Sequence, residues 1–251
     1  MNLSKSFKIC FLICLFPSLI WAQKTDYIKW NLKGKVKSIK EITYTVKSDN
    51  ATKDSLEYYY VNEFNNFGNK IIDTKFFPNG KTDKDYKYKY DNNNRRIEEN
   101  QYGSEEKHMR TIIYKYDSKG NLIEDSSVNG DGKPDKTIKY TYDDNGKESE
   151  DNSYGSDGKL LKRFTYKYDI KGNKVENCKY SADGQLEKKN TYTYDTNNNV
   201  IEESSYKADN TLNKKFIYGY EYDLQNNWIK KTVTIGTETV NILERQIEYY
   251  K

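Results

Sequence analysis

Residues that could carry out metal chemistry are few in this chain, and one short segment holds the clearest candidates. Asn129, Asp131 and Asp135 occupy the third, fifth and ninth positions of an Asp-x-Asn-x-Asp-Gly loop, which offers oxygen ligands to calcium around a glycine turn. Ser127 stands where such a loop has its first acid, and Ile138 stands where it has its last. Calcium is therefore the one cofactor for which the sequence offers ligands, and an ordinary hairpin turn is the alternative.

Side chains for nucleophilic or acid–base catalysis are scarcer still. His108 is the only histidine, and Cys178 is the only cysteine after residue 22. Neither a Ser-His-Asp or Cys-His arrangement nor a zinc site can be assembled from them. Paired carboxylates hydrolyse glycosides in other proteins, but the aspartates here recur at turn positions and no copy of the repeat described below acquires a distinctive acid pair. We expect a non-enzymatic protein with no catalytic residues, and glycoside hydrolysis is the less favoured reading.

Aromatic residues provide a different candidate site. An exposed aromatic ring has an apolar face and, in tyrosine, a polar tip, which suits stacking on a sugar ring. Four tyrosines stand beside predicted turns at multiples of 26 residues from one another, and they are the candidates for an exposed ligand-binding column, with burial in the core as the alternative: Tyr102, Tyr154, Tyr180 and Tyr206.

The elements that must position these residues come from a 26-residue repeat. Tyr-x-Tyr-Asp occurs six times, with its aspartates separated by 26 residues and, in the last step, by 28: Asp91, Asp117, Asp143, Asp169, Asp195 and Asp223. A decayed copy around Asn65 makes seven units. A fixed period of this size indicates a repeat architecture.

Each unit reads as two antiparallel strands and two turns. Apolar and polar residues alternate before each aspartate, as in Ile112, Tyr114 and Tyr116, which is typical of a half-buried strand. A first turn follows, with Gly or Asn three residues after the aspartate, and a second turn carries Asp-Gly, Asn-Gly or Asp-Asn. The columns that hold Ile123 and Val128 are an odd five residues apart, so a bulge or a change of face is expected between them.

These patterns predict an all-β fold of tandem 26-residue β-hairpins, forming a curled antiparallel sheet or an open β-shell or solenoid. Residues 1–22 read as a signal peptide, 23–61 as an N-terminal lead-in with capping strands, 62–235 as the repeat array, and 236–251 as a C-terminal capping strand. Most Tyr-x-Tyr residues are assigned to the core.

Charge and cysteine content limit the partners. Loss of Lys5 and Lys8 with the signal peptide lowers the net charge from +4 to +2, and the remaining charges are interspersed without a basic patch, so no nucleic-acid partner is expected. One remaining cysteine allows no intramolecular disulfide. We predict a secreted, periplasmic or cell-surface protein that contacts a membrane only through an uncleaved signal.

The recurring Tyr-x-Tyr-Asp-x-x-Gly-Asn-x-Ile, as in Tyr114 to Ile123, closely resembles the YD repeat of the Rhs family, and the match covers roughly residues 62–235. The resemblance implies β-hairpins that spiral into a sheet or shell, an extracytoplasmic setting and carbohydrate or surface binding. Large members of that family enclose a C-terminal toxin, and nothing after Tyr222 resembles such a domain. We therefore predict a binding or scaffolding module at the cell envelope, with glycan binding through the tyrosine column as the alternative. Its partners would be a cell-surface glycan or an envelope protein, and exposed terminal strands would permit self-association by edge pairing.

Overall fold

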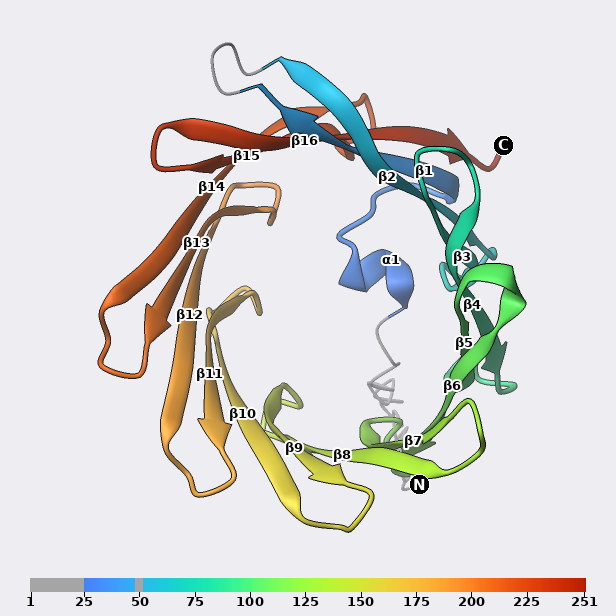
Figure 1. Ribbon diagram of the computed structural model, residues 1–251, viewed down its shortest axis with the longest axis vertical. Helices are drawn as coiled ribbons and strands as arrows, with labels where there is room; N and C mark the ends of the chain where they lie inside the picture. The colour runs from blue at the N-terminus through green and yellow to red at the C-terminus, as the bar shows by residue number, and fades with distance from the viewer. Residues whose placement is uncertain (1–24, 48–51) are drawn as a thin grey trace, which may run out of the picture.

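Alternating strands and tight turns follow one another along almost the whole chain. The computed structural model describes residues 25–47 and 52–251, so the predicted signal peptide lies outside the described residues. Sixteen antiparallel strands lie around a closed barrel in chain order (Figure 1). The elements are α1 (Asp26–Lys29), β1 (Val36–Val46), β2 (Lys53–Phe64), β3 (Lys70–Phe76), β4 (Thr82–Tyr90), β5 (Arg96–Tyr102), η1 (Ser104–Glu106), β6 (His108–Tyr116), β7 (Leu122–Asn129), β8 (Pro134–Tyr142), β9 (Glu148–Gly155), β10 (Leu160–Tyr168), β11 (Lys174–Ser181), β12 (Leu186–Tyr194), β13 (Val200–Lys207), β14 (Leu212–Tyr222), β15 (Trp228–Ile235) and β16 (Glu238–Tyr249). Among the described residues, no helix is long and apolar enough to cross a membrane.

The prediction of an open shell, solenoid or curled sheet is wrong, because the two ends of the sheet pair with each other. In an antiparallel meander with an even number of strands, the first and last strands also run antiparallel and can share a ladder. Ile42 of β1 accordingly lies opposite Tyr59 of β2 on one side and opposite Glu244 of β16 on the other. The strands predicted as caps therefore close the barrel. Because β1 and β16 pair with each other, the barrel of the described residues has no free edge strand for the predicted pairing with another chain. Self-association through another surface stays a prediction.

The predicted turns are confirmed. All seven first-turn residues have positive φ: Gly68, Asn94, Gly120, Gly146, Gly172, Asn198 and Asn226. The second turns place Gly80, Gly132, Gly158, Gly184 and Asn210 in the same left-handed region. Turn aspartates accept backbone hydrogen bonds, as Asp117 Oδ1 does from the amides of Lys119 and Asn121 at 2.9 and 2.8 Å. These aspartates thus have a conformational role.

The predicted bulges are also present and set which side chains face outward. Tyr116 lies opposite Leu122 and Lys115 opposite Glu124, so Ile123 is the extra residue of the bulge. A second bulge follows in each hairpin, since Tyr102 lies opposite His108 and Gln101 opposite Arg110. The bulges reset the alternation, and as a result the tyrosines next to the second turns face the opposite side of the wall from the Tyr-x-Tyr pairs.

The Tyr-x-Tyr pairs face the barrel interior and tie neighbouring hairpins together. The first tyrosine donates to an acidic or amide side chain 15 residues earlier, as Tyr114 does to Glu99 and Tyr192 to Asn177 at 2.8 and 2.7 Å. The second donates to a backbone carbonyl 20 residues earlier, as Tyr116 does to Arg96 at 2.6 Å. The interior tyrosines are half-buried, so the wall is stabilised by hydrogen-bonded rungs as well as by apolar contacts.

The lead-in was not predicted to be helical, but it forms α1, which lies inside the ring of strands (Figure 1). The segment crosses the interior at the first-turn end of the barrel. Asp26 pairs with Arg96 at 3.1 Å on one wall, and Asn31 donates to the Asn197 carbonyl at 2.8 Å on the other. The buried apolar cluster beside it contains Leu32, Val36, Ile39 and Phe64.

Candidate binding surfaces

The four predicted ligand-binding tyrosines lie on the outer face of the barrel. Side chains alternate between the two faces of β5, so Glu99 faces the interior and Tyr102 faces outward. The other three tyrosines occupy the same register of their strands. Each ring is half-buried and has a cation over one face: Lys87 at 4.7 Å from Tyr102, Lys139 at 5.5 Å from Tyr154, Arg163 at 4.4 Å from Tyr180 and Lys189 at 4.9 Å from Tyr206. Tyr154 has the most distant cation of the four. Ligand binding by these residues stays a prediction.

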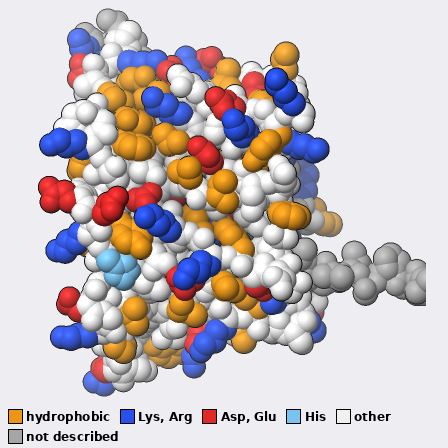
Figure 2. Space-filling view, turned by 90° about the vertical axis from the view of Figure 1, so that its right-hand side faces the viewer, with side chains coloured by type: hydrophobic (Ala, Val, Ile, Leu, Met, Phe, Trp, Pro, Cys, Tyr) orange, Lys and Arg blue, Asp and Glu red, His pale blue; other side chains and the backbone are white. Residues whose placement is uncertain are grey.

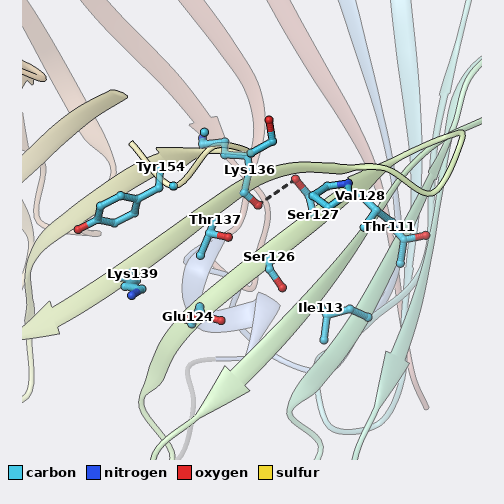
Figure 3. Close-up of a pocket in the computed structure, with 14 residues that line it drawn as sticks. Thr111, Ile113, Glu124, Ser126, Ser127, Val128, Lys136, Thr137, Lys139 and Tyr154 are labelled. Atoms are coloured by element: carbon cyan, nitrogen blue, oxygen red, sulfur yellow. Dashed lines mark hydrogen bonds between the residues drawn. The ribbon is translucent and has the colours of Figure 1, made fainter. Parts of the chain in front are cut away.

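Tyr154 borders a groove that has a volume of about 580 Å³. Figure 3 shows Tyr154 on one side, Ile113, Thr111 and Val128 on the other, and the short side chains of Ser126 and Thr137 between them. Among the described residues, neither the Ser126 nor the Thr137 hydroxyl is hydrogen-bonded to another residue. Free hydroxyls between an aromatic wall and an aliphatic wall suit a ligand with both apolar and hydroxylated faces.

The groove exists because two residues depart from the repeat. Val128 stands where four other copies have the outward tyrosine, and Ile113 stands where two copies have the lysine that covers such a tyrosine. A valine fills less space than a tyrosine, and an isoleucine brings no charge. The copy that contains β6 and β7 therefore opens a recess that the tyrosine-bearing copies fill.

Two of the three predicted calcium ligands are engaged in other contacts. Asn129 Oδ1 accepts from the amides of Asp131 and Lys133, both at 3.0 Å, and the Asp135 carboxylate pairs with Arg110 at 2.7 Å. In residues 25–47 and 52–251, no group of three or more His, Cys, Asp or Glu side chains is placed to hold a metal ion. Calcium binding stays a prediction, and it would require these contacts to break.

His108 and Cys178 occupy ordinary strand positions. The His108 ring contacts Tyr102 and its Nε2 lies 3.0 Å from the Thr111 hydroxyl. Cys178 is buried, with its thiol 3.9 Å from a Glu176 oxygen. The structure does not bring these two residues together with any catalytic partner that the sequence suggested, and the absence of enzymatic activity stays a prediction.

A second surface was missed by sequence reasoning, which found no basic patch. Six basic residues spaced 26 apart lie on the interior face of six strands: Lys84, Arg110, Lys136, Lys162, Lys188 and Lys214. We call them the basic band. They are far apart in sequence among acidic residues, but the hairpin repeat brings them to one level of the wall. The expectation that the charges form no patch is therefore wrong for the inner wall. Aligning the copies of the repeat in register would have revealed this row of basic residues.

Acidic side chains lie in the interior below the band. Burial raises the pKa of the Asp125 and Asp151 carboxyl groups, partly offset by the hydrogen bonds that Tyr140 and Tyr166 donate to them. Burial likewise raises the pKa of Tyr142 to about 12. The interior therefore has a layer of tyrosine-bound acids next to a layer of basic residues.

Comparisons with known proteins support the fold alone. No protein-family model and no curated protein matches the chain. A porin-like protein from Bacteroides uniformis aligns over 86% of this chain and 98% of that chain, with a TM-score of 0.58 and 11% identity. A porin-like protein from Bacteroides vulgatus aligns over the same fractions with a TM-score of 0.44 and 11% identity. A Tc holotoxin pore from Photorhabdus luminescens aligns over 83% of this chain and 11% of that chain, with a TM-score of 0.35 and 17% identity. Of these three, the first alone has a TM-score above 0.5, and at 11% identity the likeness indicates only an all-β barrel fold. The YD-repeat resemblance remains a feature of the sequence.

Proposed function

We propose that this protein is a non-catalytic, exported binding module of the cell envelope that holds a carbohydrate segment in the outer groove beside Tyr154. The observation that carries the proposal is the break in repeat symmetry at Ile113 and Val128, which opens a recess of about 580 Å³ next to the outward Tyr154. That volume lies within the usual range for small-ligand sites.

The lining of the groove matches the chemistry of a sugar. The Tyr154 ring offers a flat apolar face, and the hydroxyls of Ser126 and Thr137 offer both donors and acceptors. Lys139, which lies opposite Glu124 across the sheet, adds a charged donor at the edge. A sugar ring has an apolar face and an equatorial rim of hydroxyls, so it can use all three.

The outer wall supports a role in contact with water. Lys89 pairs with Glu98 at 2.7 Å and Lys115 with Glu124 at 2.6 Å, and all four side chains point outward. Figure 2 shows apolar, basic and acidic side chains interspersed over the face formed by β3–β6. A barrel wall that faces lipid carries a continuous apolar band, and this face does not resemble one.

The proposal is tested by a glycan-array and purified cell-wall binding screen with residues 23–251. Val128→Tyr should abolish binding of neutral glycans, because it places in the groove the residue type that the other copies accommodate, and folding should be preserved. Tyr154→Ala should weaken binding by about tenfold, since one stacked aromatic contact contributes on the order of 1 kcal/mol or more.

Tyr206→Ala is the matched control, because Tyr206 occupies the same column of the repeat and does not line this groove. It should bind like the unmodified protein. Equal losses in Tyr154→Ala and Tyr206→Ala would move the site to the whole tyrosine column. Binding of neutral glycans by Val128→Tyr would show that the groove is not the site. No binding to any glycan would refute carbohydrate recognition.

A further inference from the structure

The basic band lies at the mouth of the barrel opposite the lead-in segment. Its residues stand near the second turns, as Lys136 does two residues after Pro134 at the start of β8. The lead-in instead contacts first-turn residues, with Tyr27 donating its amide to the Gly68 carbonyl at 3.0 Å and Lys33 donating to Asn227 at 2.8 Å. In the part of the chain that the structure describes, α1 and its flanking residues therefore leave the second-turn mouth uncovered.

The side chains of the band point inward. Arg110, Ile112 and Tyr114 alternate on one face of β6, and the Tyr114 hydroxyl reaches the interior Glu99. Lys162 and Lys214 lie over the rings of Phe164 and Phe216, two residues further along the same faces, at 5.5 and 5.4 Å. The band is thus a row of cations on the inner wall.

Most of this charge is not paired with acids. Of the six residues, Arg110 alone takes part in an ion pair among residues 25–47 and 52–251, with Asp135 at 2.7 Å. Lys188 lies directly opposite Lys179 of β11 and Lys207 of β13, and like charges in opposite positions destabilise a sheet. Lys179 reaches Glu187 at 2.6 Å, whereas Lys188 and Lys207 form no ion pair among the described residues.

The neighbouring cations also affect one another. The pKa of Lys136 is lowered by burial and then by the charges of Lys162 and Arg110, with Asp125 and Asp151 opposing this shift. An anion bound at this level would relieve the repulsion between these groups.

We propose that the basic band is a binding site for an acidic polysaccharide, whose carboxylate or sulfate groups contact successive lysines around the second-turn mouth. Residues of the band in adjacent units are two strands apart, or roughly 10 Å along the wall. A flexible chain with regularly spaced anionic groups can follow such a row. This inference goes beyond the proposed function, since it concerns the inner face of the wall and recognises the anionic groups of a glycan.

A nucleic acid is the less suitable occupant. Proteins that bind single strands without sequence preference combine basic grooves with free aromatic faces on which bases stack. The phenylalanines that flank the band, Phe164 and Phe216, each have a lysine over one ring face, at 5.5 and 5.4 Å. The acids Asp125 and Asp151 beneath the band would also repel a deeply inserted backbone.

The test uses residues 23–251 and three fluorescent probes of similar length: polygalacturonate, a heparin-type sulfated oligosaccharide and single-stranded DNA. The triple variant Lys162→Gln, Lys188→Gln, Lys214→Gln should bind the carboxylated or the sulfated glycan about tenfold more weakly, because three charge contacts are lost. Binding by the unmodified protein should weaken as salt is raised from 50 to 200 mM, as roughly expected for screened contacts.

The matched control removes the same charge from the outer wall. Lys89→Gln, Lys115→Gln, Lys167→Gln changes three exposed lysines that pair with outward glutamates, and it should alter binding less than about twofold. Equal losses in the two triple variants would show that net charge alone explains the weaker binding, and this would overturn the proposed site. Tighter binding of DNA than of either glycan, or no binding of any probe at 50 mM salt, would also overturn it. Val128→Tyr should retain acidic-glycan binding, which separates this result from failure of the outer groove.

Discussion

The tyrosine rungs of the interior predict a difference in stability between two otherwise equivalent substitutions. Tyr114 and Tyr192 occupy the same position of the repeat, and each donates a hydrogen bond to the hairpin before it. The acceptor of Tyr114 is the Glu99 carboxylate at 2.8 Å, and that of Tyr192 is the Asn177 amide oxygen at 2.7 Å. The geometry is therefore matched, and the charge of the acceptor differs.

Tyr114→Phe should lower the free energy of unfolding by about 1.5–3 kcal/mol, the range for a hydrogen bond to a charged group. Glu99 is 7% exposed and keeps its contacts with Arg96 and Gln101, so its carboxylate is not left wholly without donors. Tyr192→Phe should lower the same free energy by about 0.5–1.5 kcal/mol, as for a neutral pair.

Both values follow from urea denaturation, monitored by far-UV circular dichroism and tryptophan fluorescence. Coincident transitions by the two probes are required, since a repeat protein can lose cooperativity. Equal losses in the two variants, or a larger loss in Tyr192→Phe, would refute the reasoning that the charge of the acceptor sets the strength of the rung.

Two further predictions concern buried carboxylates. Burial raises the folded-state pKa of Asp125, so this group favours folding most below its unfolded pKa of about 4 and that contribution is lost as the pH rises through the folded value. Asp125→Asn should therefore be at least as stable as the unmodified protein at pH 7, and its relative advantage should disappear near pH 4; Asn177 shows that the position accepts an amide. Asp26→Ala should lower the free energy of unfolding by about 3–5 kcal/mol, because it removes one partner of a buried ion pair with Arg96.

Urea titrations at several pH values measure both effects. An Asp125→Asn variant that is less stable at pH 7 than at pH 4, relative to the unmodified protein, would contradict the assignment of a raised pKa. Ile28→Ala is the control for the helix, since Ile28 is 58% exposed and its change should be within about 0.5 kcal/mol. A similar loss in both helix variants would show that the ion pair is not what holds α1.

Parts of the candidate sites could be predicted from the sequence. Tyr154 was identified from its place beside a turn, and Val128 is visible as an exception in the same column. That the exception opens a groove depends on side chains from four neighbouring strands, including Ile113 and Thr137. The basic band was missed because Lys136 and Lys162 are 26 residues apart, and only the pairing of hairpins places them near each other.

The sequence by itself determined the local structure. Alternation produces the strands, Asp with Gly or Asn produces turns that need positive φ, and the five-residue offset produces the bulges, all of which involve residues close together in the chain. Closure was decided only by tertiary structure. It depends on pairs such as Glu41 and Arg245, joined at 2.8 Å across almost the whole chain, and on a lead-in that crosses the interior from Arg96 to Asn197. Local preferences do not encode the curvature that sixteen twisted strands accumulate, so the open and closed forms could be told apart only once the first and last strands were seen to meet.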